Sequence, residues 1–365
     1  MALENRSHGV AADQARLSHI DGLRGVAILG VMLFHAYARW PTVVPFGGRY
    51  ASFPPFLYGW VGVPLFFLIS GFVILMTLER SDGLANFLYR RWLRLFPAMF
   101  FCSLFVFFTS PFFSERPGGA PDWWSLLPGL TFIQPAIWSQ VIGDVSPIEG
   151  AFWTIFIEVK FYIVFGALFF LLGMRRAVLA VVAIHLVSAG LGLANLPDEG
   201  VFHVIARLND LLDGRSFGWF AAGALFYLHA RDPDHRKLAL AVGMALVAVA
   251  SIPNVGSDGK VAALLVIALF VAGVTVAPLR ALLGSRFLIF LGFVSYPLYL
   301  MHENMMISLV VKLGAALPWL SGLLLPVLSA VPIIAVSWLV AKYVEPWIRA
   351  RLRPSSRRAA TARAV

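Results

Sequence analysis

Long apolar stretches repeat along the whole chain, separated by short segments that are charged or rich in proline and glycine. A stretch of about 17–25 mostly apolar residues is long enough to cross a lipid bilayer as a helix. Because the hydrocarbon core offers no water to backbone polar groups, such stretches predict an all-α, polytopic transmembrane helical bundle. About ten windows fit, and they run roughly over residues 20–40, 57–78, 95–110, 151–172, 177–194, 215–230, 238–253, 261–278, 287–308 and 323–344.

Composition supports one continuous membrane domain. Hydrophobic residues make up 59% of the chain and charged residues 13%, against about 45–50% and 25% in soluble proteins. We therefore predict a membrane domain over residues 19–346, between a polar segment (1–18) and a basic tail (347–365). The polar segment lacks the features of a secretory signal and is expected to stay on the protein. The single cysteine, Cys102, lies in an apolar run and is interpreted as packing; alone it forms neither an intrachain disulfide nor a cysteine metal site, and no metal is expected.

Basic residues gather in alternate connecting segments, and cytoplasmic loops normally carry this excess. With both termini in the cytoplasm, 20 of the 29 lysines and arginines lie on the cytoplasmic side. The net charge of +10 then reflects positive-inside topology and contact with anionic membrane lipids. The tail RARLRPSSRRAATARAV has no aromatic interleaving, so we expect a disordered, lipid-facing end and no nucleic-acid partner.

The first window carries Arg24 and His35, and ionisable residues within a membrane are functional candidates because burying them is costly. Their spacing of eleven residues is about three helical turns, which puts both side chains on one face about 16 Å apart. Asp21 precedes Arg24 by one turn. Histidine suits a general base, and arginine keeps its charge and grips phosphate or carboxylate. This pattern favours an anionic donor at the cytoplasmic end and hydroxyl chemistry further out, although His35 alone also fits a hydrogen-bonded core imidazole.

Two further segments allow a functional and a plain interpretation. Arg91 and Arg94, in the predicted loop between the second and third spans, share a helical face if that loop end is helical; they suit phosphate binding, but positive-inside topology also predicts arginines there. The external segment over residues 111–150 is rich in tryptophan, proline and glycine. It fits a lid over an external pocket as well as an interfacial aromatic belt.

Five motifs, in order, resemble those of the acyltransferase 3 family of membrane acyltransferases, and together they span about residues 19 to 346. They are IDGLRGVAILGVMLFHA with Arg24 and His35 in R-x10-H spacing, GVPLFFLISGFVI from Gly62 to Ile74, FLYRRWLRLFP with Arg91 and Arg94, FWTIFIEVKFY with Trp153, Glu158, Phe161 and Tyr162, and VSYPLYLMH with Ser295, Tyr296, Tyr299, Leu300 and His302. The sequence departs from the family at Val159, where a second acidic residue is common. The following Lys160, if buried, is expected to neutralise Glu158 or Glu149.

The resemblance implies a multi-pass protein of the bacterial inner membrane that transfers an acyl group, usually acetyl from cytosolic acetyl-CoA, to a hydroxyl of a glycan or another acceptor. In this chain it implies that His35 is the base, that Arg91 and Arg94 hold the coenzyme A phosphates, and that Arg24 positions the donor. Secondary candidates for orienting His35 or lining the pocket are Asp21, Ser70, Trp153, Glu158, Tyr162, Tyr296 and His302; Ser70 also fits plain helix packing beside Gly71.

Family members often carry an external hydrolase-like domain after the last span, and we expect this chain to complete transfer within the membrane domain. The competing class is a transporter of a small anionic solute or acyl carrier, because carriers also have polytopic helices with buried charges. No inverted repeat is evident between the halves. The acceptor, the identity of the acyl group, a direct or acyl-enzyme route and the oligomeric state stay open.

Overall fold

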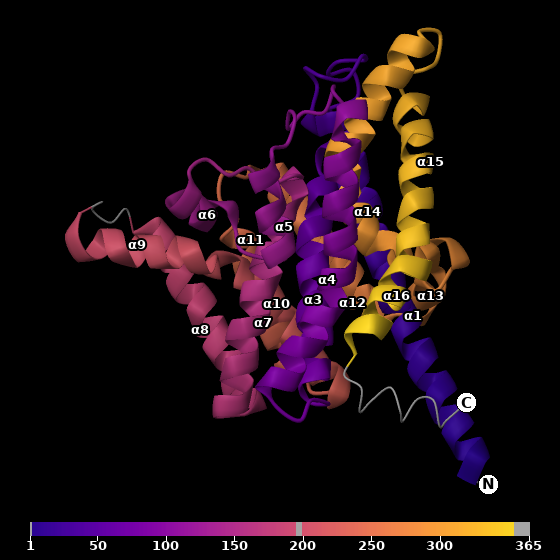
Figure 1. Ribbon diagram of the computed structural model, residues 1–365. Helices are drawn as coiled ribbons and strands as arrows, with labels where there is room; N and C mark the ends of the chain where they lie inside the picture. The colour runs from indigo at the N-terminus through magenta and orange to yellow at the C-terminus, as the bar shows by residue number, and fades with distance from the viewer. Residues whose placement is uncertain (1, 195–198, 354–365) are drawn as a thin grey trace. The chain divides into compact units, whose positions relative to one another are not determined.

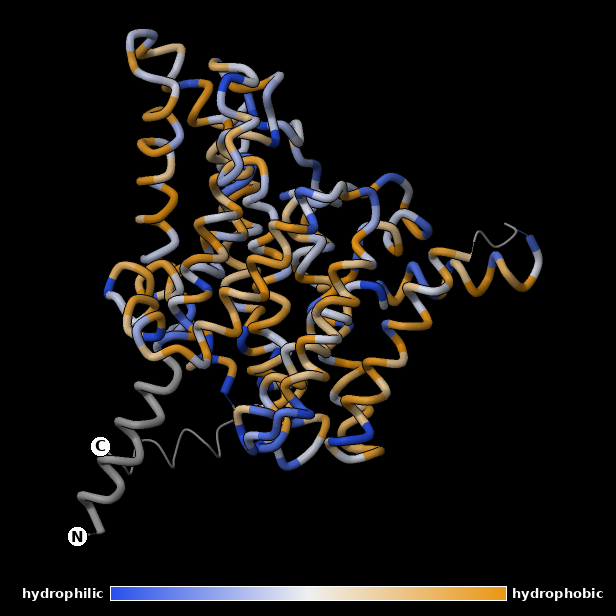
Figure 2. The backbone as a smooth tube through the Cα atoms, turned by 180° about the vertical axis from the view of Figure 1, so that it is seen from behind, coloured by the Kyte–Doolittle hydropathy of each residue, from blue (hydrophilic) through white to orange (hydrophobic). Residues whose placement is uncertain are grey.

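The computed structural model describes the backbone of residues 2–194 and 199–353, and within these ranges the side chains from residue 18 onward. This part of the chain is helical and contains no strand, which confirms the predicted all-α class (Figure 1). The first part of the predicted tail (347–365) is helical, because a helix spans Glu345–Leu352, which corrects the expected disorder there. Residues 354–365 of the tail lie outside the described residues. Hydrophobic residues dominate the long helices, and polar residues gather at helix ends and connecting loops (Figure 2).

Seven helical segments among the described residues are long and apolar enough to cross a membrane. A bent pair, Ala277–Leu283 with Arg286–Ala316, passes the same test across a 61° break and raises the number to eight. The sequence predicts about ten spans. Two of the predicted windows hold α10 (Phe217–Arg231) and α11 (His235–Ala250), which have only 15 and 16 residues and are short for a span. The seven segments are Ser18–Arg39, Gly59–Leu78, Leu84–Phe112, Gly150–Leu172, Met174–Leu193, Ser257–Thr275 and Leu324–Leu352.

The chain divides into two compact units. The first unit comprises Met1–Phe34, Phe53–Leu88 and Thr154–Gly292; the second comprises His35–Ser52, Tyr89–Trp153 and Phe293–Val365. The elements of the first unit are α1 (Ala2–Phe34), α2 (Pro54–Leu57), η2 (Gly59–Val61), α3 (Gly62–Leu78), nearly all of α7 (Trp153–Leu172), α8 (Met174–Leu193), α9 (Gly200–Leu212), η6 (Gly214–Ser216), α10 (Phe217–Arg231), α11 (His235–Ala250), α12 (Ser257–Thr275) and α13 (Ala277–Leu283).

The second unit contains the short elements of the external segment and the C-terminal helices. Its elements are η1 (His35–Arg39), η3 (Ser110–Phe112), η4 (Trp123–Ser125), α5 (Leu126–Thr131), α6 (Pro135–Ile142), η5 (Gly150–Phe152), α15 (Leu324–Leu339), η7 (Val340–Val344) and α16 (Glu345–Leu352). Most of α4 (Leu84–Thr109) and of α14 (Arg286–Ala316) also belongs to it.

In the first unit, α3 and α10 pack through glycines. A Cβ on Gly71 would lie 2.0 Å from the carbonyl oxygen of Phe220, and one on Gly223 would lie 2.1 Å from that of Leu68. The rings of Phe67 and Phe220 stack beside this contact, with centroids 4.5 Å apart. Small residues let helix backbones approach closely where lipid supplies no hydrophobic drive, so these glycines fix how the two helices pack.

In the second unit, an apolar cluster holds the segment after η1 against α14 and α15. Val44, Ile307, Val310 and Leu325 are all at most 6% exposed and form its centre. Helix α14 stays continuous through Pro297. This packing fixes the stretch of α14 that carries His302.

Candidate functional site

His35 lies where the first helix changes form. Helix α1 ends at Phe34, and the π-helix η1 begins at His35; single π-helical turns occur often at functional sites. In the second unit, Nδ1 of His35 lies 3.1 Å from Nε2 of His302, and the two rings meet edge to face. The structure therefore brings together two histidines that are 267 positions apart in the sequence.

The hydrogen bonds of His302 indicate which nitrogen of His35 carries a proton. Nδ1 of His302 lies 2.9 Å from the carbonyl oxygen of Tyr299, and a carbonyl can only accept, so this nitrogen carries a proton. Neutral His302 then has an unprotonated Nε2, which accepts the proton on Nδ1 of His35. In neutral His35 the remaining nitrogen, Nε2, is then unprotonated, which is the form a general base needs.

The carboxylate of Glu303 lies on the same side as this nitrogen. Its Oε1 is 3.5 Å from Nε2 of His35, and the Glu303 side chain is 7% exposed. A Cβ on Gly150 would lie 2.7 Å from Oε2 of Glu303, so glycine at position 150 leaves the space that the carboxylate occupies. A proton gained by Nε2 of His35 would thus form an imidazolium beside a negative charge.

The next residue of α14, Asn304, is bound on both sides by the external segment. Its backbone N–H and its Nδ2 both donate to Oε2 of Glu149, at 3.0 and 2.9 Å, and its Oδ1 accepts from the backbone N–H of Gly118 at 2.9 Å. Arg116 is 6% exposed and donates to the carbonyl of Ile148. Two stretches of the external segment, near residues 116 and 149, therefore hold α14 directly beside His302 and Glu303.

Burial changes the protonation of this segment. Loss of water raises the pKa of the fully buried Glu149 carboxyl to about 8, despite the opposing charge of Arg116. The same loss of water lowers the pKa of Arg116. At neutral pH Glu149 is therefore mostly a protonated acid whose Oε2 still accepts the two Asn304 hydrogen bonds.

Glu115 ties the same segment to α14 one and two turns further on. It accepts from Ser308 Oγ and from Lys312 Nζ, both at 3.0 Å. The hydrogen bond from Lys312 is the main cause that lowers the pKa of Glu115 to about 2. Glu115 and Glu149 therefore anchor α14 at Asn304, Ser308 and Lys312, on the C-terminal side of His302 and Glu303.

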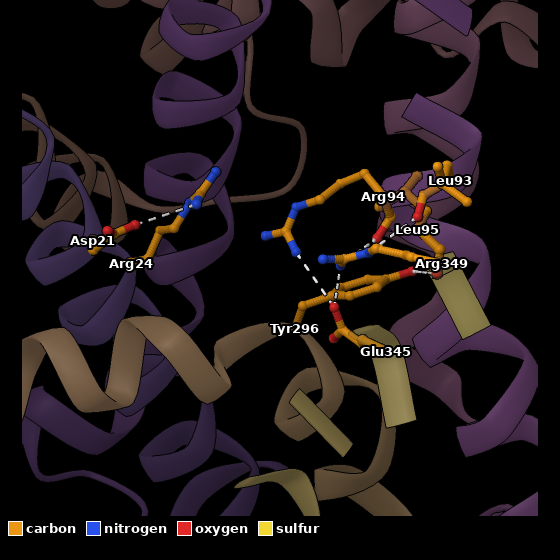
Figure 3. A network of polar contacts seen from close by, with 8 residues as sticks. All are labelled: Asp21, Arg24, Leu93, Arg94, Leu95, Tyr296, Glu345 and Arg349. Atoms are coloured by element: carbon orange, nitrogen blue, oxygen red, sulfur yellow. Dashed lines mark hydrogen bonds and ion pairs between the residues drawn. The ribbon is translucent and has the colours of Figure 1, made fainter. Parts of the chain in front are cut away.

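The arginine cluster lies inside a helix, which corrects the predicted loop. Helix α4 begins at Leu84, so Arg91 and Arg94 are helical; the hydropathy window began later because it excluded these charges. Arg94 lies 3.8 Å from Glu345, which also pairs with Arg349 (Figure 3). The cluster thus includes a counter-charge from α16.

Tyr296 belongs to this cluster. Its hydroxyl donates to the carbonyl of Leu95 at 3.0 Å, and the Arg94 guanidinium lies 5.9 Å from its ring centroid. Arg349 donates to the carbonyls of Leu93 and Arg94 at 3.3 and 3.5 Å (Figure 3). These bonds join α14 and α16 to α4 within the second unit.

The remaining candidates form separate contacts. In the first unit Arg24 pairs with Asp21 at 3.4 Å (Figure 3). Gly22 lets the helix that carries Asp21 and Arg24, α1, pack closely against α13, since a Cβ on Gly22 would lie 1.9 Å from the carbonyl oxygen of Leu283. In the second unit the side chain of Trp153 is half-exposed. No group of three or more histidine, cysteine, aspartate or glutamate side chains in the described chain is placed to hold a metal.

Glu158 has partners of its own in the first unit. It accepts from Ser70 at 2.7 Å and from Tyr162, so these three candidates meet. Lys160 pairs with Asp213 at 2.5 Å, whereas the sequence predicts Glu158 or Glu149 as its partner. Asp213 ends α9 in a left-handed conformation, which the sequence does not reveal.

The sequence motifs do not include Glu303, Asn304 or Arg116, and Glu149 is predicted only as a partner of Lys160. One sequence feature does point to this site. His302, Glu303 and Asn304 are three successive polar residues within an apolar window, where burial of each polar side chain costs free energy. Arg116 and Glu149 gave no such signal, because they lie in an irregular segment whose path only the fold determines.

A helical, multi-span chain with a histidine pair and buried carboxylates defines a class of membrane enzyme candidates, and comparison with known proteins places the chain within one family. The chain belongs to the acyltransferase 3 family, since the family's acyltransferase domain matches residues 17–342.

Curated relatives support the assignment at low identity. The chain is 26% identical over 166 residues to the peptidoglycan O-acetyltransferase OatA of Listeria monocytogenes, covering 40% of this chain and 23% of that protein. It is 26% identical over 243 residues to the O-acetyl transferase of Shigella phage Sf6, covering 63% and 69%. A third relative, nodulation protein 10 of Rhizobium leguminosarum bv. viciae, is 37% identical over 83 residues, covering 23% and 22%. The chain spans about a quarter of the length of the Listeria protein. No solved structure matches.

Proposed function

We propose that the protein is an integral membrane O-acyltransferase that moves an acyl group, most simply acetyl, from cytosolic acyl-CoA to a hydroxyl of a glycan or another acceptor. The observation that carries the proposal is the contact of His35 Nδ1 with His302 Nε2 at 3.1 Å, with Glu303 Oε1 3.5 Å from the other ring nitrogen of His35. Family membership supplies the acyl-transfer class.

In the proposed reaction the acceptor hydroxyl gives its proton to Nε2 of His35 as its oxygen attacks the thioester carbon. The C–O ester bond forms and the C–S bond breaks. The departing thiolate takes the proton back from His35, which regenerates the base. Glu303 stabilises the transient imidazolium, because an ion pair with little water around it is stronger than one in bulk solvent.

The hydrogen bonds of Asn304 support a positioning role for the external segment. Glu149, Gly118 and Gly150 meet α14 beside His302 and Glu303. General bases work only within hydrogen-bond reach of the proton they remove. An anchored α14 keeps His302 at hydrogen-bond distance from His35. Such a positioning role would give the external segment a function besides that of an interfacial aromatic belt.

For the donor, we propose that Arg91 and Arg94 contact the coenzyme A phosphates and that Arg24 positions the pantetheine arm. Arginine binds phosphate through a planar fork of donors. The expected orientation, with both termini in the cytoplasm of an inner membrane, puts these arginines on the donor side. The names of the relatives favour acetyl as the group and a cell-surface glycan as the acceptor.

The test uses purified protein in proteoliposomes with acetyl-CoA labelled in the acetyl group and a membrane glycan fraction as acceptor. We expect label to appear in glycan as an ester that mild base releases, together with free coenzyme A. Uptake of a solute without loss of the thioester would instead identify a transporter and reject the proposal.

A further inference from the structure

The first unit contains a cavity that none of the residues proposed above lines. Its volume is about 350 Å³, within the usual range of about 300–1,000 Å³ for small-molecule sites. Its walls come from the ends of α3, α10 and α12, from α13, and from α1. Five separate elements thus converge on one hollow.

Cationic and imidazole side chains dominate its polar lining. Arg80 follows α3, Arg231 ends α10 and Arg280 lies on α13, while His19 and His229 complete the set. His19 is 8% exposed, although the three arginines are open to solvent. The positive-inside rule explains arginines at helix ends, but not their convergence on one hollow with a buried histidine.

One carboxylate orders part of this lining. Glu79 pairs with Arg231 and accepts from the hydroxyl of Tyr227 at 2.5 Å. Arg80 and Arg280 also line the cavity, and its lining residues include no aspartate or glutamate. Such a lining is suited to a ligand with more than one negative charge.

The cavity also has an aromatic wall. The rings of Phe72 and Tyr227 both line it and meet edge to face, with centroids 5.2 Å apart. Met76 and Val274 add apolar surface. Aromatic rings stack on nucleobases, and arginines bind phosphates. A nucleotide can therefore contact both the aromatic residues and the arginines of the cavity, whereas a free phosphate can contact only the arginines.

We propose that this cavity binds the nucleotide end of the acyl donor, an adenine ring on a phosphorylated ribose. The inference rests on the proposed acyl-CoA function, which it deepens by assigning a second anion site besides Arg91 and Arg94. Arg80 and Arg280 contact phosphate, and Phe72 and Tyr227 lie against the base. Binding energy gained far from the thioester then serves to hold the reacting carbon in place.

The binding test uses the full-length protein in nanodiscs of phosphatidylcholine with adenosine 3′,5′-bisphosphate as the probe. We expect the double variant Arg80→Gln with Arg280→Gln to bind it about tenfold more weakly or worse, since two charge-assisted contacts are lost. Arg176→Gln, an exposed arginine of the same unit that does not line the cavity, is the matched control and should bind as the wild type does.

Three results would overturn the assignment. The first is equal affinity of the wild type and the double variant for the probe, when thermal unfolding shows that both proteins are folded. The second is probe binding no tighter than that of inorganic phosphate, which would mark a phosphate site. The third is loss of probe binding when phosphatidic acid is added to the nanodisc, which would mark a lipid-headgroup site.

A truncated donor separates this inference from the proposed reaction. S-acetylpantetheine lacks the nucleotide, so the double variant should transfer from it at the wild-type rate while losing about tenfold in kcat/KM with acetyl-CoA. Equal losses with both donors would contradict the inference. If the wild type transfers from neither donor, the proposed function fails, and the binding measurement still decides whether the cavity takes a nucleotide.

Discussion

At the residue scale, the site depends on a chain of hydrogen bonds that starts at a backbone carbonyl. Tyr299 fixes the proton of His302, His302 fixes the proton of His35, and Nε2 of His35 is left facing Glu303. The sequence placed His35 and His302 among the candidates but could not show that they touch. Glu303 was missed because its role comes from its distance to His35, which only the packing of α14 sets.

Replacing Glu303 by glutamine tests the counter-charge. Glu303→Gln keeps the shape but removes the charge that stabilises a protonated His35. We expect kcat to fall about 10- to 100-fold with little change in KM, because a charge-assisted contact is worth about 1.5–3 kcal/mol. Steady-state transfer in proteoliposomes measures this, with the exposed Glu199→Gln as control. An unchanged kcat would remove Glu303 from the mechanism.

Replacing Glu149 tests its protonated state. Folded Glu149 keeps its proton up to about pH 8, whereas the unfolded chain releases it near pH 4.5, so the free energy of unfolding falls as pH rises between these values. Glu149→Gln is always neutral and should lose less stability between pH 5 and pH 8.5 than the wild type.

The matched variant Glu149→Ala leaves the donors of Asn304 without an acceptor and should cost about 1–3 kcal/mol. Thermal unfolding in detergent at the two pH values compares the three proteins. Equal destabilisation by glutamine and alanine would argue that Glu149 acts as a carboxylate.

At the element scale, hydropathy located the helices but not their ends. Hydropathy predicts a loop at Arg91 and Arg94 because charged residues end a hydropathy window, yet α4 continues through them. Likewise α10 and α11 filled predicted windows but are short for spans. Close packing between elements depends on glycines whose neighbours the sequence does not reveal.

Gly71→Ala tests the packing of α3 on α10. The added Cβ would meet the carbonyl of Phe220 at 2.0 Å, and backbone atoms cannot move aside cheaply. We expect a loss of about 1–3 kcal/mol of stability, read as a lower unfolding temperature in detergent. Gly243→Ala, with nothing within 4 Å of its Cβ position, should leave stability unchanged or slightly raised. Similar behaviour of the two variants would refute close packing at Gly71.

At the scale of the whole molecule, the sequence was sufficient for the class and the family. Composition and repeated apolar windows indicated a helical membrane protein, and motif order indicated the acyltransferase 3 family, to which the chain belongs. The sequence was not sufficient to predict which polar residues lie together in the folded protein. The histidine pair lies in one unit and the cationic cavity in the other, and each is assembled from segments that are distant in the chain.

The most direct test of the account is the transfer rate of His35→Ala in proteoliposomes under single-turnover conditions with labelled acetyl-CoA. Thermal unfolding confirms that the variant folds. General-base catalysis contributes about 10²- to 10⁴-fold, so we predict a loss of this size with donor binding retained. Transfer at the wild-type rate by a folded His35→Ala protein would contradict the account.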